Sequence, residues 1–547
     1  MTGVATLWRT VRHLKAGQIA GRIAFKLQRP RADRRPAPPL RSVRGRWVAP
    51  APRGASLEAP ATFDLLGERH ALDAVGWDGP GVTRLWRYHQ HYFDDLHAHG
   101  ATGRSALHAA LIERWLAENA PGRGPGWEPY PLSLRVVRWI QWLLAGNSAP
   151  AGMLGSLAVQ VRWLARRLET HLLGNHLFAN AKALLFAGLF FDGDEAAAWL
   201  RTGTAILSRE LPEQILGDGG QFERSPMYHA LALVDVLDLL DAIAALAPGD
   251  AALAKLHGEL AGRVPAMLRW LAAMTHPDGT LGRFNDCADG IAPDNGALFR
   301  FAAELGFAAP AEMPNDVVVL RDSGYVRVAH GSVVALLDIA PVGPDYLPGH
   351  AHADTLSFEL SLARRRIVVN GGTSCYGDGP ARQRERATAA HSTVEIAGQS
   401  SSEVWAGFRV GRRARPDGPH VEHDAAGRLR VEGAHDGYAH LPGRPVHRRL
   451  WSFDDTGLTI EDSVSAPGAR ALARFHLAPG LSLAAIDARR WRIVEGTAAL
   501  AEVDVIAGDA LQEPSSYAPR FGVVESTCCL AIALADGRAA TRWRWLR

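Results

Sequence analysis

The feature that most restricts the fold is a change in hydrophobic period near residue 316. Before it, apolar residues recur three or four positions apart, whereas "PNDVVVLRDSGYVRVAHGSVVALLDIAP" (314–341) begins a region in which they alternate. The first spacing places apolar side chains on one face of a helix, and the second places them on one face of a strand. The sequence therefore predicts helices followed by strands, and 547 residues are too many for a single ordinary core.

We expect three parts. A basic opening segment and a Pro/Arg-rich connector occupy residues 1–62, a helical domain occupies 63–312 and an antiparallel β-sandwich occupies 313–547. Short Gly, Pro and Asp breaks separate the helices, so successive antiparallel hairpins form either a solenoid or a closed toroid. No fixed-period repeat is visible, which disfavours a consensus repeat array. The predicted helices cover 103–119, 132–146, 152–172, 176–191, 194–210, 228–246, 251–274 and 293–306.

Short strands rich in Val, Ile and Leu, punctuated by turn residues, are typical of an antiparallel sandwich. The predicted strands are "YVRVAH", "SVVALLDI", "LSFELSL", "RIVVNG", "STVEIAG", "HRRLWSF", "LTIEDSV", "WRIVE" and "CCLAIAL".

The overall charge excludes several partners. Lys and Arg number 60 against 57 Asp and Glu, which is too balanced to indicate nucleic acid or an anionic membrane surface, so local basic patches must provide any anion recognition. The four cysteines show no CxxC spacing, and nothing requires an oxidising compartment. No signal peptide or transmembrane segment is visible. The opening segment is either a basic amphipathic helix on a membrane surface or, more commonly for such a segment, a helix docked on its own protein.

Two motifs in the helical region place polar groups at helix starts. "LLGNHLFANAKALLFAGLFF" (172–191) carries Asn175, His176 and Asn180 ahead of an apolar run, although Asn175 alone would also suit a helix cap. "GGQFERSPMYHALALVDVL" (219–237) brings Glu223, Arg224, Tyr228 and His229 around a helix start. A phenol with a pKa of about 10 is a poor base unless nearby positive charge lowers that pKa. Arg224, one turn earlier, is a candidate for that charge; plain packing is the alternative for Tyr228.

A third motif, "GHAHADTLSFEL" (349–360), carries two histidines into an alternating strand. Because alternate residues of a strand share one face, we expect His350, His352 and Asp354 to extend the apolar face of this strand. His352 and His391, with a third ligand, would suit Zn²⁺, and a hydrogen-bonded core pair is the alternative.

Three further segments mix aromatic and basic residues. They are 86–96, 126–140 and 401–416, and they contain His89, Arg135 and Trp405. Aromatic faces stack on sugars and Arg binds carboxylate or sulfate, so these residues are candidates for substrate binding; the core is the alternative for most of the tryptophans.

In this order along one chain, from about 85 to 415, these motifs resemble the heparinase II/III-like polysaccharide lyases. The resemblance implies an incomplete (α/α) toroid followed by an antiparallel β-sandwich, with a substrate groove between them.

The resemblance also implies roles for individual residues. Asn175, together with His176, would bind the uronate carboxylate, and Tyr228 and His350 would transfer protons. Glu223, Arg224, His89, Arg135 and Trp405 are further expected substrate contacts. A structural Zn²⁺, the only cofactor expected, would be held by His352, Asn370 and His391; Asn370 stands where the family pattern has Asp.

The expected activity is β-elimination on a uronate polysaccharide or oligosaccharide, which needs no second catalytic carboxylate. Two alternatives stay open. One is a glycoside hydrolase with Glu223 or Asp286 as its acid, and the other is a non-catalytic glycan-binding or assembly protein. The polymer and the oligomeric state stay open, as does the location, because the resemblance implies the periplasm or cell envelope and no export signal is visible.

Overall fold

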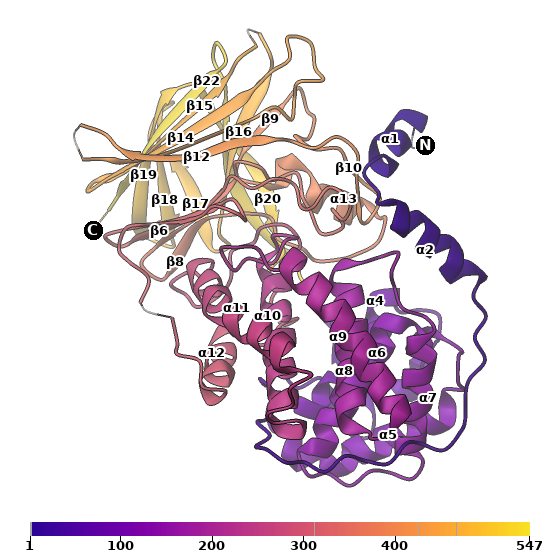
Figure 1. Ribbon diagram of the computed structural model, residues 1–547. Helices are drawn as coiled ribbons and strands as arrows, with labels where there is room; N and C mark the ends of the chain where they lie inside the picture. Colours follow the sequence, from indigo (N-terminus) through magenta and orange to yellow (C-terminus); the bar gives the residue numbers. More distant parts are fainter. Residues whose placement is uncertain (1–2, 311, 426, 467, 547) are drawn as a thin grey trace.

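The computed structural model describes residues 3–310, 312–425, 427–466 and 468–546. Helices form the first half of the chain and antiparallel sheets the second, as the two bodies of Figure 1 show. This confirms the predicted fold class. The helical half ends with α12 at Glu304 and the sandwich begins with β4 at Val317, so the predicted division at 312/313 lies in the segment between them.

The helices mostly follow the predicted apolar periodicity, and the eight predicted segments correspond to α5–α12. Helices α3, α4 and α13 were not predicted, and the segment of α4 had been interpreted only as aromatic and basic. The helices are α1 (Val4–Val11), α2 (Ala16–Leu27), α3 (Leu72–Val75), α4 (Arg84–Tyr92), α5 (Ser105–Glu118), α6 (Pro129–Leu144), α7 (Met153–Ala165), α8 (Gly174–Phe190), α9 (Asp194–Gln214), α10 (Pro226–Leu246), α11 (Ala254–Ala273), α12 (Asn295–Glu304) and α13 (Pro380–Arg386).

Helix α8 lies at the centre of the helical half. All but two of its residues, Asn175 and His176, are buried, because the helix is apolar on every side. It packs against α6, α9 and α10. The approach to α9 is close: a Cβ on Gly188 would lie 2.6 Å from the backbone nitrogen of Leu200. The polar first turn of α8 is therefore the part of this helix that a ligand can reach.

The strands form two large sheets and two small ones. They are β1 (Leu57–Glu58), β2 (Thr62–Leu65), β3 (Glu68–Ala71), β4 (Val317–Leu320), β5 (Tyr325–His330), β6 (Val333–Asp338), β7 (Phe358–Leu362), β8 (Arg365–Val369), β9 (Val394–Ile396), β10 (Val404–Trp405), β11 (Arg409–Val410), β12 (Pro416–His423), β13 (Leu429–His435), β14 (His447–Asp454), β15 (Gly457–Val464), β16 (Ala471–Leu477), β17 (Leu481–Ala485), β18 (Arg490–Glu495), β19 (Ala498–Ala507), β20 (Asp509–Tyr517), β21 (Glu525–Ala533) and β22 (Arg538–Trp545).

The sandwich is built from two antiparallel sheets. One has the order β12-β13-β14-β15-β22-β19-β18-β17, and the other has the order β20-β21-β16-β8-β7-β6-β5-β4, with β9 paired to β16. Their inner faces share one apolar core, in which Phe358 and Phe475 of one sheet meet Trp451 and Trp543 of the other.

The histidine motif is not the start of a strand as predicted. Strand β7 begins only at Phe358, and Leu356 has a φ of 63° that interrupts the extended backbone. Residues 349–357 instead form a loop that reaches the helical half, where the backbone N–H of Asp286 donates to the carbonyl of His350 at 2.9 Å. This loop places the candidate site at the junction of the two halves.

The opening segment runs along the outside of the molecule. After α1 and α2, an extended stretch follows the helical half, where Leu40 bridges to Phe191 and Gly45 donates to the carbonyl of Ala245 (Figure 1). Among the described residues, no helix has both the length and the apolar character that crossing a membrane requires.

Candidate active site

One buried carboxylate joins the two histidines of the "GHAHAD" loop. Asp286 lies between α11 and α12; its Oδ2 accepts from His350 Nδ1 and its Oδ1 from His352 Nε2, both at 2.9 Å. Arg382 of α13 donates to both oxygens of the same carboxylate. Burial alone would raise the pKa of Asp286, but Arg382 and the two histidines outweigh it and hold that pKa well below its usual range. Asp286 is therefore a permanent anion that fixes both imidazoles.

Tyr228 covers the half-buried face of this cluster. It lies in the first turn of α10, where Ser225 caps the helix by accepting from the backbone N–H of Tyr228. Its ring stacks on His350 with centroids 3.7 Å apart, and its hydroxyl lies 3.0 Å from that of Tyr376. Burial, followed by the neighbouring Tyr376, raises the pKa of Tyr228 well above its usual value. The phenol is therefore neutral and has a proton to give.

The start of α8 supplies the second group of polar side chains. The N-cap position is Leu173, which makes no side-chain cap, so Asn175 is not the helix cap but lies half-buried in the first turn. His176 Nδ1 lies 3.1 Å from Glu169 Oε1 and its ring packs 4.3 Å from that of Tyr130. Burial alone would lower the pKa of His176, but Glu169 outweighs it and the pKa is raised. The raised pKa favours the cationic imidazole, and positive charge at a helix N-terminus favours an anionic ligand.

Glu223 links the two groups. Its Oε2 lies 3.7 Å from His350 Nε2, and its carboxylate interacts electrostatically with His176 as well. Burial raises the pKa of Glu223, and His350 opposes part of that rise. Because only 3% of Glu223 is exposed, its carboxyl group lines the site and is shielded from bulk solvent.

The backbone is strained at four positions beside these residues. Leu173, Arg224, Asn285 and Leu356 have φ values of 62°, 61°, 55° and 63°, in the left-handed region that side chains other than glycine rarely adopt. Each lies within two residues of a polar group of the cluster or in the loop that carries His352. Such strain persists only where surrounding contacts impose it, and it concentrates at functional sites.

Asn285 shows how those contacts are made. Its Oδ1 accepts from the backbone N–H of His352, and its Nδ2 donates to the carbonyl of Arg224, both at 3.0 Å. Its own N–H donates to Asp354 at 3.0 Å. One amide thus connects the loops that carry the histidines, Asp286 and Tyr228, which gives the site a rigid frame.

Two family descriptions match this chain in order. "Heparinase II/III N-terminus" matches residues 119–296, and "Heparinase II/III-like, C-terminal" matches residues 312–546. The chain belongs to the heparinase II/III-like family.

Two kinds of relatives are found. The chain is 28% identical over 513 residues to FtsZ-localized protein C of Caulobacter vibrioides, covering 86% of this chain and 84% of that protein. It is 34% identical over 249 residues to a heparin-sulfate lyase of Bacteroides stercoris, covering 41% of this chain and 35% of the lyase. The match to the first relative is thus nearly end to end, whereas the match to the lyase covers about a third of it.

Solved structures show the same fold. Heparinase III aligns with a TM-score of 0.66 at 18% identity, over 85% of this chain and 76% of that one. The heparan sulfate lyase HepC of Pedobacter heparinus aligns with a TM-score of 0.57 at 18% identity, over 88% and 80%. The toroid and sandwich of the heparinase II/III-like family are therefore the architecture of this protein.

Two residues predicted to contact substrate lie elsewhere. Arg135 is fully buried in the helical core, where its guanidinium packs 3.9 Å from the ring of Trp115 and donates to Gln160 and to the carbonyl of Gly126. Arg224 turns toward the sandwich and donates to the carbonyl of Ser323 at 3.0 Å. The backbone of Arg224 is left-handed, and its side chain therefore points away from Tyr228. Contrary to the expectation, Arg224 does not lower the pKa of the Tyr228 phenol.

The other two aromatic or basic candidates remain predictions. Trp405, in β10, donates from Nε1 to Thr10 of α1 at 3.0 Å. His89 packs 4.7 Å from Tyr92, which in turn lies 6.0 Å from Tyr130, so an aromatic row leads from His89 to His176. Burial lowers the pKa of His89 to about 4, and the ring is neutral.

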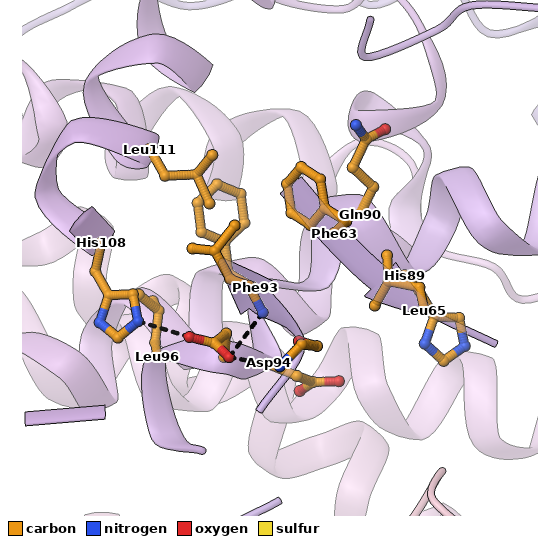
Figure 2. A pocket seen from close by; sticks show the side chains of 12 residues that line it. Phe63, Leu65, His89, Gln90, Phe93, Asp94, Leu96, His108 and Leu111 are labelled. Atoms are coloured by element: carbon orange, nitrogen blue, oxygen red, sulfur yellow. Dashed lines mark hydrogen bonds and ion pairs between the residues drawn. The ribbon is translucent and has the colours of Figure 1, made fainter. Parts of the chain in front are cut away.

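His89 also lines a small cavity at the outer end of that row. Figure 2 shows this cavity between Phe63, Phe93 and Leu111, with the His108–Asp95 hydrogen bond of 2.8 Å at one side. Its volume is about 20 Å³, which accommodates one water molecule and no sugar. The cavity is therefore a packing feature and not a substrate pocket.

The expected zinc ligands make a partial set. His352 Nδ1 lies 3.3 Å from His391 Nε2, which would suit either a shared proton or a shared metal. Asn370, however, accepts from the backbone N–H of Ser392 and donates to Ser357 Oγ. Among the residues described here, no three His, Cys, Asp or Glu side chains are grouped to hold a metal. These donors fit zinc poorly, and no step proposed below uses a metal.

Three important residues were not assigned their roles from the sequence. Asp286 had been considered only as a hydrolase acid, and Arg382 and Tyr376 had been given no role. Tyr376 lies in the segment "GTSCYGDG" (372–379), which by itself does not indicate a function for the tyrosine. Nothing local in the sequence indicates that Arg382 and Asp286, 96 positions apart, form an ion pair.

Proposed function

We propose that this protein is a polysaccharide lyase that cleaves a uronate-containing polysaccharide by β-elimination and leaves an unsaturated uronate end. The observation that supports this most is the stack of Tyr228 on His350, with Asp286 fixing the far side of the imidazole. A neutral proton donor and a proton acceptor thus lie side by side, and both are partly accessible.

His350 is the proposed base. Because Nδ1 donates its proton to the permanently ionised Asp286, the Nε2 atom carries the free lone pair. The same arrangement stabilises the imidazolium that forms when Nε2 takes a proton. Glu223, at 3.7 Å from Nε2, would add to that stabilisation.

Tyr228 is the proposed acid. Its raised pKa keeps the hydroxyl protonated, which suits donation to a leaving oxygen and disfavours a phenolate base. The contact with Tyr376 orients the hydroxyl.

Asn175 and His176 are the proposed carboxylate contacts. The C5 proton of a uronate is weakly acidic beside an ionised carboxylate, so the site must oppose the charge that develops there. The raised pKa of His176 and the N-terminus of α8 supply positive potential at this place.

The step balances with these groups alone. The C5–H bond breaks and its proton moves to His350 Nε2, while the electron pair forms the C4–C5 double bond. The C4–O bond breaks, and the leaving oxygen takes the proton of Tyr228. Water attacks no bond, so a second carboxylate is not needed.

A glycoside hydrolase is a weaker proposal than it was from the sequence. Asp286 is no candidate acid, because both oxygens accept from Arg382 and the histidines and its pKa is held low. Glu223 alone would lack the opposed carboxylate that most hydrolases use.

A non-catalytic glycan-binding or assembly protein is the second candidate. The observation in its favour is the nearly end-to-end match to FtsZ-localized protein C. A protein of this kind would bind a saccharide and would form no cleavage product from it.

The experiment is a screen of uronate polysaccharides, including heparan sulfate, alginate and bacterial exopolysaccharides. We expect new ultraviolet absorbance from an unsaturated uronate with the wild-type protein and none with His350→Ala. New reducing ends without absorbance would indicate a hydrolase. Saccharide binding by calorimetry without either signal would indicate the non-catalytic protein.

A further inference from the structure

The two N-terminal helices hold an unusual share of the apolar surface. Of the exposed large apolar side chains in the described parts of the chain, half lie within residues 4–27. On α1, Val4 and Trp8 are 86% and 64% exposed, and on α2, Ile23 and Leu27 are 58% and 75% exposed. The complete set in this segment is Val4, Leu7, Trp8, Leu14, Ile19, Ile23 and Leu27.

These side chains form a stripe on each helix. Val4, Leu7 and Trp8 are three and four positions apart on α1, and Ile19, Ile23 and Leu27 follow at intervals of four on α2. Residues at those intervals share one helix face. Each helix therefore presents a continuous apolar face to the outside.

The same helices contact the protein body mainly through polar side chains, and the Phe25 ring of α2 also packs 4.5 Å from that of His171. The only buried residues of α1 and α2 are Thr10 and Gln18. Arg9 forms an ion pair with Glu403, and Lys15 forms one with Glu213 at 2.5 Å. Gln18 donates to the carbonyl of Tyr346 at 3.2 Å.

This orientation is the reverse of an ordinary docked helix, which would bury its apolar face. Figure 1 shows α1 and α2 at the edge of the molecule, with α1 beside β10. The polar contacts thus hold both stripes outward.

The charge of the segment is equally one-sided. Residues 1–32 contain no Asp or Glu, although the whole chain is nearly balanced at +3. The segment carries seven cations, and all of them except Arg9 are exposed. Lysine and arginine beside an apolar stripe suit an interface between hydrocarbon and anionic headgroups.

We propose that α1 and α2 bind an anionic membrane surface, with the two apolar stripes inserted at the level of the headgroups and the cations against lipid phosphates. A second copy of this chain fits less well. In a symmetric pair the same patch would face itself, and the exposed cations beside both stripes would meet. This proposal is independent of the lyase activity.

The test is flotation of the full chain with lipid vesicles. We expect binding to vesicles of equal parts phosphatidylglycerol and phosphatidylcholine, weaker binding to phosphatidylcholine alone, and release by salt. The variant Leu7→Glu/Ile23→Glu removes one apolar side chain from each stripe, and both positions are exposed, so folding is retained. Its binding should fall at least about tenfold, given the free energy of burying two such side chains.

The matched control is Ile506→Glu/Val524→Glu, which makes the same kind of change at side chains 56% and 60% exposed in the sandwich. It should bind vesicles as the wild type does. The proposal is overturned if the helix variant also binds like the wild type, or if both vesicle types bind equally. A wild-type dimer by light scattering that dissociates in the helix variant, without vesicle binding, would show a second copy instead.

Discussion

Two buried clusters, one at the junction of the two halves and one within the sandwich, are built from almost the same groups. In one, Asp286 binds His352 and Arg382, and His352 in turn lies 3.3 Å from His391. In the other, Asp462 binds His447 and Arg449, and His447 lies 3.3 Å from His435. Each is an arginine, a carboxylate and two imidazoles, and in each the arginine holds the carboxylate pKa low against the effect of burial.

The difference lies at the second oxygen of the carboxylate. Asp286 Oδ2 also accepts from His350, whose side chain is 12% exposed and lies under Tyr228. Asp462, by contrast, is bonded to a single histidine of the described residues, His447, and its cluster is closed: His435, His447 and Arg449 are all at most 1% exposed. Arg449 instead donates to the carbonyls of Leu356 and Ser392, in the segments that carry His352 and His391.

The comparison shows that a buried Asp–His–His–Arg set is not by itself evidence of catalysis. One cluster secures the strands behind the site, and the other has a partly exposed histidine, His350, at which a substrate proton could be received. The predictions below separate these two roles.

The largest effect is expected from Tyr228→Phe at the open cluster. The variant removes only the hydroxyl, so turnover on the uronate substrate should fall by about 10²–10⁴ while folding and saccharide affinity are kept. Steady-state kinetics and calorimetry measure the two quantities. The control is Tyr438→Phe, which removes a buried hydroxyl bonded to the carbonyl of Val394 in the sandwich and should leave turnover unchanged. A fall of less than about tenfold for Tyr228→Phe would remove the acid role.

The next effect compares Asp286→Asn with Asp462→Asn. Each leaves a buried arginine without its anion, so each should lower the free energy of unfolding by about 3–5 kcal/mol, seen as a lower urea midpoint. Only Asp286→Asn should also lower the turnover of the folded protein, because only Asp286 fixes His350. If Asp462→Asn lowers turnover as much at a temperature where it is folded, the two clusters do not have separate roles.

A smaller effect is expected from acid. Burial lowers the pKa of His352 to about 4, against about 6.5 in an unfolded chain. Between these values the unfolded state binds the extra proton, so stability falls as the pH drops from about 6.5 to about 4, and this residue contributes about 3 kcal/mol of that loss. Urea unfolding at several pH values should show a shallower dependence for His352→Asn. An unchanged dependence would mean that His352 is not held neutral.

The smallest effect concerns metal. Asn370→Asp would place a carboxylate near the His352–His391 pair, where carboxylate is a better zinc ligand than an amide. We expect elemental analysis to find more zinc in Asn370→Asp than in the wild type, and none in Asn370→Asp/His391→Ala. Equal zinc in all three proteins would indicate that His352, Asn370 and His391 form a hydrogen-bonded polar cluster and not a metal site.

The sequence by itself determined the order of helices and strands. Helical periodicity predicted α8 and α10 within about two residues, and strand β5 coincides with "YVRVAH". Periodicity works here because it depends on neighbours a few positions away and on which side of an element must be buried. The order of the motifs was also enough to indicate the family, because each motif is local.

Only the tertiary structure decided which side chains meet. Asp286 joins His350 across 64 positions and Arg382 across 96, and those contacts exist because loops from the two halves dock on each other. Arg224 turned away from Tyr228 and Arg135 entered the core for the same reason: a side chain follows the partners and the backbone direction that packing gives it. Local sequence pattern carries no information about such distant partners, so the groups of the site were largely predicted and their connections were not.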